Sequence, residues 1–64
     1  MEVDVSKLPE WQRDILNRAS DPQRRRVIGF LERGWTIIEG RFGGNIKINC
    51  GFSYEQVKTD GLTE

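Results

Sequence analysis

Arginine dominates the basic residues of this chain, and several arginines recur at a spacing that suits the binding of anionic groups. Seven of the ten basic residues are arginine. A guanidinium makes planar, bidentate contacts with phosphate or carboxylate and also stacks on aromatic rings. On a helix over residues 22–33, one outward stripe contains Arg26, Gly29 and Arg33, with Arg25 beside it. A glycine within such a stripe lets another backbone come close.

A second group of candidate contact residues lies in the segment after this helix. Trp35 and Ile37 fall on the expected solvent side of a β-hairpin, together with Arg41 and Lys47. Tryptophan and arginine are enriched in the hot spots of protein interfaces, so both groups together are the predicted partner-binding residues. Two alternatives stay open: the arginines form an ordinary solvated surface, or another part of the chain covers Trp35 and Ile37.

The residue types that perform catalysis are sparse in this sequence. The chain has no histidine, the commonest general base, and a single cysteine, Cys50, on the expected apolar side of the hairpin. The glycines of residues 40–44 lack the following Lys-Ser or Lys-Thr of a phosphate-binding loop. Without histidine or further cysteines an ordinary zinc site cannot be completed. We therefore expect no enzymatic activity, no cofactor and no metal.

The elements that position these residues begin with two amphipathic helices. The first is predicted over residues 8–20, with Ser6 as N-cap, Pro9 in the first turn and an apolar stripe of Leu8, Trp11, Ile15 and Ala19. The second is predicted over residues 22–33, with Asp21 as N-cap, Pro22 at the first helical position and Gly34 after the end. Its apolar arc consists of Val27, Ile28, Phe30 and Leu31.

Residues 35–52 are predicted to form one β-hairpin around Gly43-Gly44-Asn45, whose residues accept positive φ at little cost. With these three residues as the loop, the pairs are Phe42 with Ile46, Gly40 with Ile48, Ile38 with Cys50 and Thr36 with Phe52. These residues form an apolar face for the helices to cover. Because side chains alternate along a strand, the other face carries Trp35, Ile37, Glu39, Arg41, Lys47, Asn49 and Gly51.

The two ends of the chain give weaker patterns. Glu2–Val5 alternates polar and apolar residues, so it is either a short strand at the hairpin edge or a leader without structure. Ser53-Tyr54-Glu55-Gln56 matches a capping box and indicates a helical turn, while an irregular strand over residues 54–59 is the alternative. Residues 59–64 are expected to be a frayed tail.

These elements predict one small α+β domain, in which two amphipathic helices cover one face of a C-terminal antiparallel hairpin. A chain of 64 residues buries a small core, so additional stability from self-association or a partner is expected. One cysteine in so small a chain argues against a secreted, disulfide-rich domain and for the cytoplasm. No apolar run approaches the roughly 20 residues that cross a bilayer, so no membrane association is expected.

The sequence favours a small regulatory or accessory protein, such as an inhibitor, that binds a larger protein through the hairpin edge and the arginine and tryptophan surface, alone or as a homodimer. The alternative is a reduced winged-helix protein that binds nucleic acid through Arg24, Arg25, Arg26 and Arg33 and through the hairpin tip. Residues 11–50 hold eight basic and four acidic residues, a local charge of +4. The whole chain is neutral, however, and this argues against nucleic acid.

Overall fold

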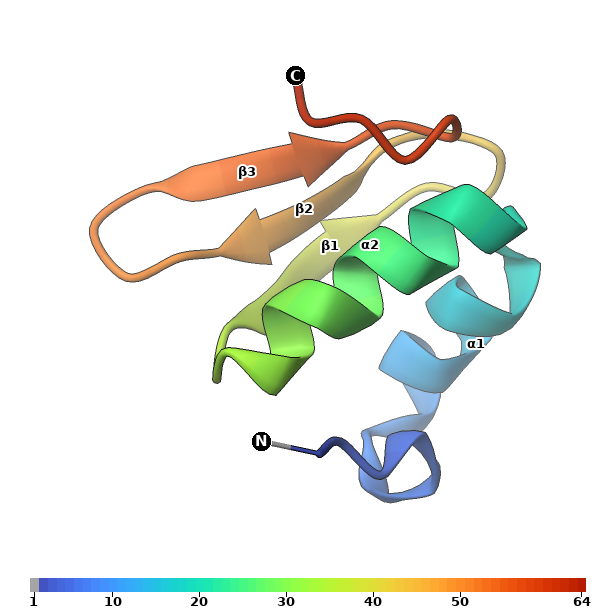
Figure 1. Ribbon diagram of the computed structural model, residues 1–64. Helices are drawn as coiled ribbons and strands as arrows, with labels where there is room; N and C mark the ends of the chain where they lie inside the picture. The colour runs from blue at the N-terminus through green and yellow to red at the C-terminus, as the bar shows by residue number, and fades with distance from the viewer. Residues whose placement is uncertain (1) are drawn as a thin grey trace.

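The computed structural model describes residues 2–64 and shows the α+β arrangement predicted from the sequence (Figure 1). The helices precede the strands, in the order η1 (Val5–Lys7, a 3-10 turn), α1 (Glu10–Arg18), α2 (Asp21–Glu32), β1 (Thr36–Gly40), β2 (Ile46–Asn49) and β3 (Tyr54–Val57). The strands form one antiparallel sheet in the order β1-β2-β3. In Figure 1, α2 lies across one face of this sheet, with α1 beside it. The predicted hairpin is therefore the first two strands of a three-stranded sheet.

The helix boundaries differ from the predicted ones at their first turns. Ser20, not Asp21, is the N-cap of α2, and its hydroxyl accepts a hydrogen bond of 3.2 Å from the backbone N–H of Gln23. Asp21 and Pro22 form the first turn, where a missing N–H costs nothing. At the other end Gly34 has φ +89°, a left-handed conformation that ends a helix at little cost. The predicted stop at Gly34 is thus confirmed.

The start of α1 lacks the predicted Ser6 cap. The residue before Glu10 is Pro9, which makes no side-chain cap. Asp4 instead caps the preceding 3-10 turn, where its carboxylate accepts from the backbone N–H of Ser6 at 3.0 Å. The short strand considered for Glu2–Val5 is absent, because residues 2–4 have no regular structure and Val5 opens the 3-10 turn.

The hydrophobic core lies between the helices and the inner face of the sheet. Both helices and all three strands contribute buried side chains: Ile15, Leu16, Val27, Phe30, Leu31, Ile37, Ile46, Ile48 and Val57. One polar side chain is buried with them. The amide of Gln23 donates to the carbonyl of Gly44 at 2.8 Å and to that of Val57 at 3.0 Å, so α2 is joined to the β1–β2 loop and to β3.

The register of the hairpin differs from the predicted one. Gly40 pairs with Ile46 rather than Ile48, and the connection spans residues 41–45 instead of three residues. Phe42 therefore leaves the sheet and is exposed, as is Phe52, which lies beyond the end of β2. Their placement on the apolar face was wrong because the core is filled without them.

A β-bulge in β1 reverses which of its two isoleucines faces the core. The register shifts between Ile37 and Glu39, so Ile38 has no partner and Ile37 pairs with Ile48. The extra residue reverses the alternation of side chains along the strand. Ile37 is consequently buried, with 3% of its surface exposed, and Ile38 is 46% exposed. The prediction of Ile37 on the solvent face and Ile38 on the apolar face was wrong.

The C-terminal segment is ordered rather than helical or frayed. Tyr54–Val57 forms β3, so the helical turn suggested by the capping box is wrong, and the strand alternative is the one observed. Residues 59–64, predicted to fray, turn back on β3 through a bridge between Val57 and Thr63. The hydroxyl of Ser20 donates to the carbonyl of Thr59, which ties this segment to the start of α2.

No helix within residues 2–64 has the length and apolar composition needed to cross a membrane.

Candidate functional site

The outer side of α2 carries a shallow pocket of about 190 Å³ that we call the arginine pocket. It is lined by Arg25, Arg26, Gly29, Phe30 and Arg33. Arg25 or Arg26, Gly29 and Arg33 follow one another at three or four residues, so they lie along one side of the helix, and Phe30 lies at its edge. The opposite side of α2, with Val27 and Leu31, is buried in the core. The same amphipathic pattern that packs α2 on the sheet thus presents the arginines outward.

Phe30, which lines the arginine pocket, stacks on the ring of Trp35. The rings of Phe30 and Trp35 lie 5.1 Å apart between centroids, with an angle of 19° between their planes. The guanidinium carbon of Arg26 is 5.3 Å from the Phe30 centroid, and that of Arg33 is 5.9 Å from both centroids. At these distances a cation is attracted to the ring face. The aromatic pair therefore restrains two of the three arginines that line the pocket.

The lining of the arginine pocket is positively charged. Its lining contains three arginines and no acidic residue. The ion pair between Arg24 and Asp21, at 2.7 Å, does not involve a pocket residue. The pocket arginines can therefore offer their N–H groups to an incoming carboxylate or phosphate.

Arg24, considered for a phosphate contact, makes bonds within the fold. Its side chain donates to the carbonyls of Leu16 at 2.9 Å and Ala19 at 2.8 Å, and it forms the ion pair with Asp21. The two carbonyls belong to the C-terminal end of α1 and the residue after it, whose orphan acceptors need partners. Arg24 therefore fixes the corner between the helices.

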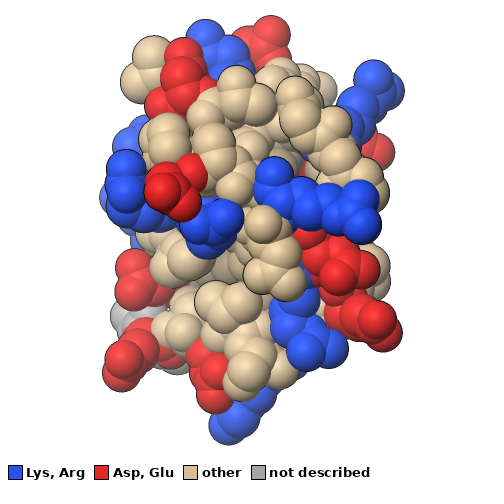
Figure 2. Space-filling view, turned by 90° about the vertical axis from the view of Figure 1, so that its right-hand side faces the viewer, with Lys and Arg blue, Asp and Glu red and all other residues tan. Residues whose placement is uncertain are grey.

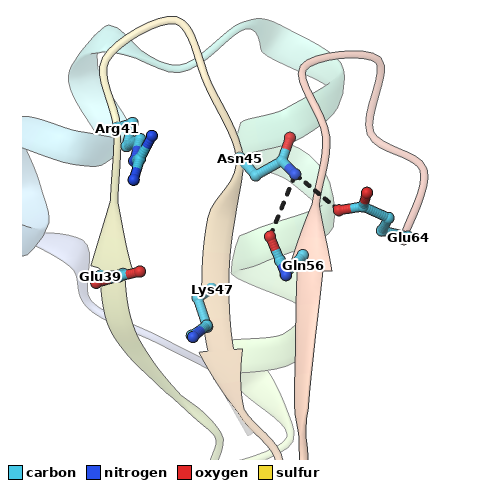
Figure 3. Close-up of a pocket in the computed structure, with 6 residues that line it drawn as sticks. All are labelled: Glu39, Arg41, Asn45, Lys47, Gln56 and Glu64. Atoms are coloured by element: carbon cyan, nitrogen blue, oxygen red, sulfur yellow. Dashed lines mark hydrogen bonds between the residues drawn. The ribbon is translucent and has the colours of Figure 1, made fainter.

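Arg41 and Lys47 lie in a different hollow, on the open face of the sheet (Figure 3). This hollow, which we call the sheet hollow, has a volume of about 410 Å³ and is lined by Glu39, Arg41, Asn45, Lys47, Gln56 and Glu64. The side-chain N–H₂ of Asn45 donates to Gln56 at 3.3 Å and to Glu64 at 2.9 Å. Two acidic residues offset the two basic ones here, so the sheet hollow does not select a ligand of one sign.

The sequence-predicted contact residues thus separate into three groups. Arg25, Arg26, Gly29, Arg33 and Trp35 come together at the arginine pocket. Arg41 and Lys47 are on the other side of the sheet, since the helices lie behind it in Figure 3. Ile37 is in the core. Sequence reasoning missed Phe30 as part of the site, although it lies four residues after Arg26 and three before Arg33, on the same side of the helix.

Both edges of the sheet are partly covered. At β3, the backbone N–H of Glu64 donates to the carbonyl of Gln56 at 2.9 Å, and Thr63 bridges to Val57. At β1, the bulge interrupts the ladder and the side chain of Gln12 donates to the carbonyl of Ile37 at 3.4 Å. Bulges and short covering segments are common ways to block pairing with another chain. The predicted hairpin edge is therefore a poorer docking site than the arginine pocket.

The remaining surface shows no comparable charge cluster on the face drawn in Figure 2. This face is the right-hand side of Figure 1, and on it acidic and basic side chains are interspersed around a continuous tan area. Such mixing agrees with the formal net charge of zero.

Cys50 has the surroundings of an unreactive thiol. Its side chain is half-buried and packs against the core, and its Sγ lies 3.6 Å from the carbonyl oxygen of Ile48. Burial, and then the negative charge of Glu55, raise the pKa of the Cys50 thiol. Among residues 2–64, no group of three or more potential ligands is arranged to hold a metal ion.

Comparison with known proteins adds no relative: no protein-family model matches the chain, and neither does any curated protein or solved structure.

Proposed function

We propose that this protein is a small non-enzymatic module that regulates or assists a larger protein by binding it through the arginine pocket and Trp35. The observation that supports the proposal is a pocket lined by three arginines and no acidic residue, with two of the arginines restrained on a stacked Phe30–Trp35 pair. Tryptophan, tyrosine and arginine supply most of the binding energy at protein interfaces. Restrained side chains also lose less entropy when a partner binds.

The size of a stable interface requires contacts beyond the arginine pocket. A standard interface buries roughly 800 Å² on each partner, which is about a fifth of the 4398 Å² of accessible surface here. The pocket would then be the energetic centre, surrounded by residues that exclude water. We include a cytoplasmic location in the proposal, supported by the single free cysteine.

Charge distribution favours a protein partner over nucleic acid. The winged-helix alternative needs the basic residues of α2 and the hairpin tip on one side of the molecule. Arg41 and Lys47 instead face away from the helix layer, in a hollow they share with Glu39 and Glu64. Nucleic-acid-binding domains also carry a basic excess that a neutral chain lacks.

The proposal is tested by capture with matched variants. The immobilised chain is exposed to an extract of the cells that encode it, in parallel with Arg26→Ala/Arg33→Ala and with Arg41→Ala/Lys47→Ala. Both double variants lose two positive charges, one pair at the arginine pocket and the other at the sheet hollow. We expect a specific protein to be retained by the wild-type chain and the sheet variant and lost by the pocket variant. Equal retention by all three would contradict the proposal.

Two other partners give distinct results. A second copy of this chain would give about twice the 7.4 kDa of the monomer in sedimentation equilibrium. A nucleic acid would be retarded by the chain in a gel-shift titration at about 50 mM salt and released as the salt concentration rises. The proposal predicts no such retardation.

A further inference from the structure

Gly29 occupies an unusual position, because nothing inside the protein requires a glycine there. It lies within α2, and a Cβ added to it would have no heavy atom within 4 Å. Gly40 shows the opposite case, since a Cβ there would lie 2.8 Å from Cγ2 of Ile15 in the core. A glycine inside a helix is less stable than alanine. Packing within the protein therefore does not explain the glycine at position 29.

The arginines are arranged on both sides of this glycine along the helix. Arg25 and Arg26 lie one turn before Gly29, and Arg33 lies one turn after it. Arg26 and Arg33 are seven residues apart, which corresponds to about 10 Å of helix. Alternate side chains of an extended segment are about 7 Å apart, a separation that two long arginine side chains can span from either side. The bare backbone at Gly29 allows such a segment to lie close to the helix.

We infer that the arginine pocket receives an extended acidic segment of the partner protein, with its backbone against Gly29 and its carboxylates on the flanking arginines. This inference rests on the proposed function and specifies the partner's chemistry. The guanidiniums of Arg26 and Arg33 lie within cation–π distance of Phe30 and Trp35, and a guanidinium can make bidentate contacts with a carboxylate. The pocket is lined by three arginines and no acidic residue, so its positive charge is complementary to the negative charge of an acidic segment.

The test uses an acetylated hexaglutamate peptide as the probe. The ¹⁵N-labelled chain is titrated with this peptide while the Nε–Hε signals of Arg26 and Arg33 and the amide signal of Gly29 are followed. We expect these signals to move together, and the Arg33→Lys variant, which keeps the charge, to bind at least about threefold more weakly because a lysine lacks the planar fork. Signals of the sheet hollow stay in place.

In the Gly29→Ala variant, stability and affinity for the peptide are expected to change in opposite directions. We expect this variant to melt about 4–8 °C higher, because alanine is the better helix former, and to bind hexaglutamate at least about fivefold more weakly because its methyl group occupies the contact surface. Asn17→Ala, at an exposed position near the end of α1, is the matched control. It also improves helix propensity and leaves the affinity for the peptide unchanged.

Three results would overturn the inference: unchanged affinity of Gly29→Ala, movement of the sheet-hollow signals instead of the pocket signals, or tighter binding of a thymidine dodecamer than of hexaglutamate. The capture experiment distinguishes a failure of the acidic-segment inference from a failure of the proposed function. If the pocket variant loses the captured protein and hexaglutamate does not bind, docking at the pocket stands and the acidic segment is wrong. If the pocket variant retains the protein as well, both proposals fail.

Discussion

The ring of Phe30 stacks on the ring of Trp35, and through this contact the hydrophobic core and the arginine pocket share one residue. Phe30 is a core side chain with 6% of its surface exposed, and it also lines the pocket. Trp35 is half-buried and packs against the same core. Substitutions of Phe30 or Trp35 are therefore expected to change stability as well as binding.

Trp35→Ala is expected to lower the free energy of unfolding by about 2–3 kcal/mol, because it removes the stacked ring and part of the buried apolar surface. Urea denaturation followed by circular dichroism measures this loss. Trp11→Ala is the matched control, since Trp11 is 48% exposed on α1. We expect it to cost less than about 1 kcal/mol. Equal losses in the two variants would contradict the role of Trp35 in packing.

Gln23→Met is expected to destabilise the fold by about 2–4 kcal/mol. The buried amide donates to two carbonyls, Gly44 and Val57, and methionine of similar volume leaves both without that donor. The same denaturation measurement applies. Gln12→Met provides a comparison at a half-buried position with one hydrogen bond, to Ile37. A loss at Gln23 no larger than that at Gln12 would show that the buried amide does not join α2 to the sheet.

Two glycine-to-alanine substitutions are expected to change stability in opposite directions. Gly40→Ala places a Cβ 2.8 Å from Cγ2 of Ile15, so we expect a loss of about 1–3 kcal/mol through overpacking. Gly29→Ala meets no atom within 4 Å and is expected to gain up to about 1 kcal/mol. Thermal melts of both variants test the pair. A destabilised Gly29→Ala would mean that the glycine serves the fold.

Cys50 is expected to react slowly with iodoacetamide. Burial and the nearby Glu55 raise its pKa, so at pH 8 a smaller fraction is thiolate than in the urea-unfolded chain. The alkylation rate, plotted against pH, should rise at a higher pH for the folded chain than for the unfolded chain. Glu55→Gln should move this rise to a lower pH. Because the unfolded chain releases the proton first, the free energy of unfolding falls as pH rises above the usual pKa of cysteine. Equal rates in folded and unfolded chains would contradict this description.

The helices could be read from the sequence because their signals are local. The apolar spacing of Val27, Phe30 and Leu31 and the glycine at position 34 define α2 without knowledge of the rest of the fold. The α2 part of the candidate site followed directly, since Arg25, Arg26, Gly29 and Arg33 share the side that this spacing leaves outside the core. Helical periodicity determines which side chains face outward.

The sheet was less predictable because its register depends on contacts between distant residues. Ile37 and Ile38 are both apolar, so alternation does not show which of them is the bulge. β3 was one of two alternatives, because residues 53–56 match a capping box that locally favours a helical turn, and only pairing with β2 decides for the strand. The same errors placed Ile37, Arg41 and Lys47 beside Trp35. Pairing between strands places Ile37 in the core and Arg41 and Lys47 on the open face of the sheet. The local sequence around these residues does not specify that pairing.

The most direct test of the account is photo-crosslinking from two single positions in the cells that encode the protein. The photoreactive residue p-benzoylphenylalanine replaces Arg25 at the rim of the arginine pocket in one variant, and Lys47 in the sheet hollow in the other. We predict a crosslinked partner protein of one defined mass from position 25 and none of that mass from position 47. A partner crosslinked from position 47 alone, or nucleic acid crosslinked from position 25, would contradict docking through the arginine pocket.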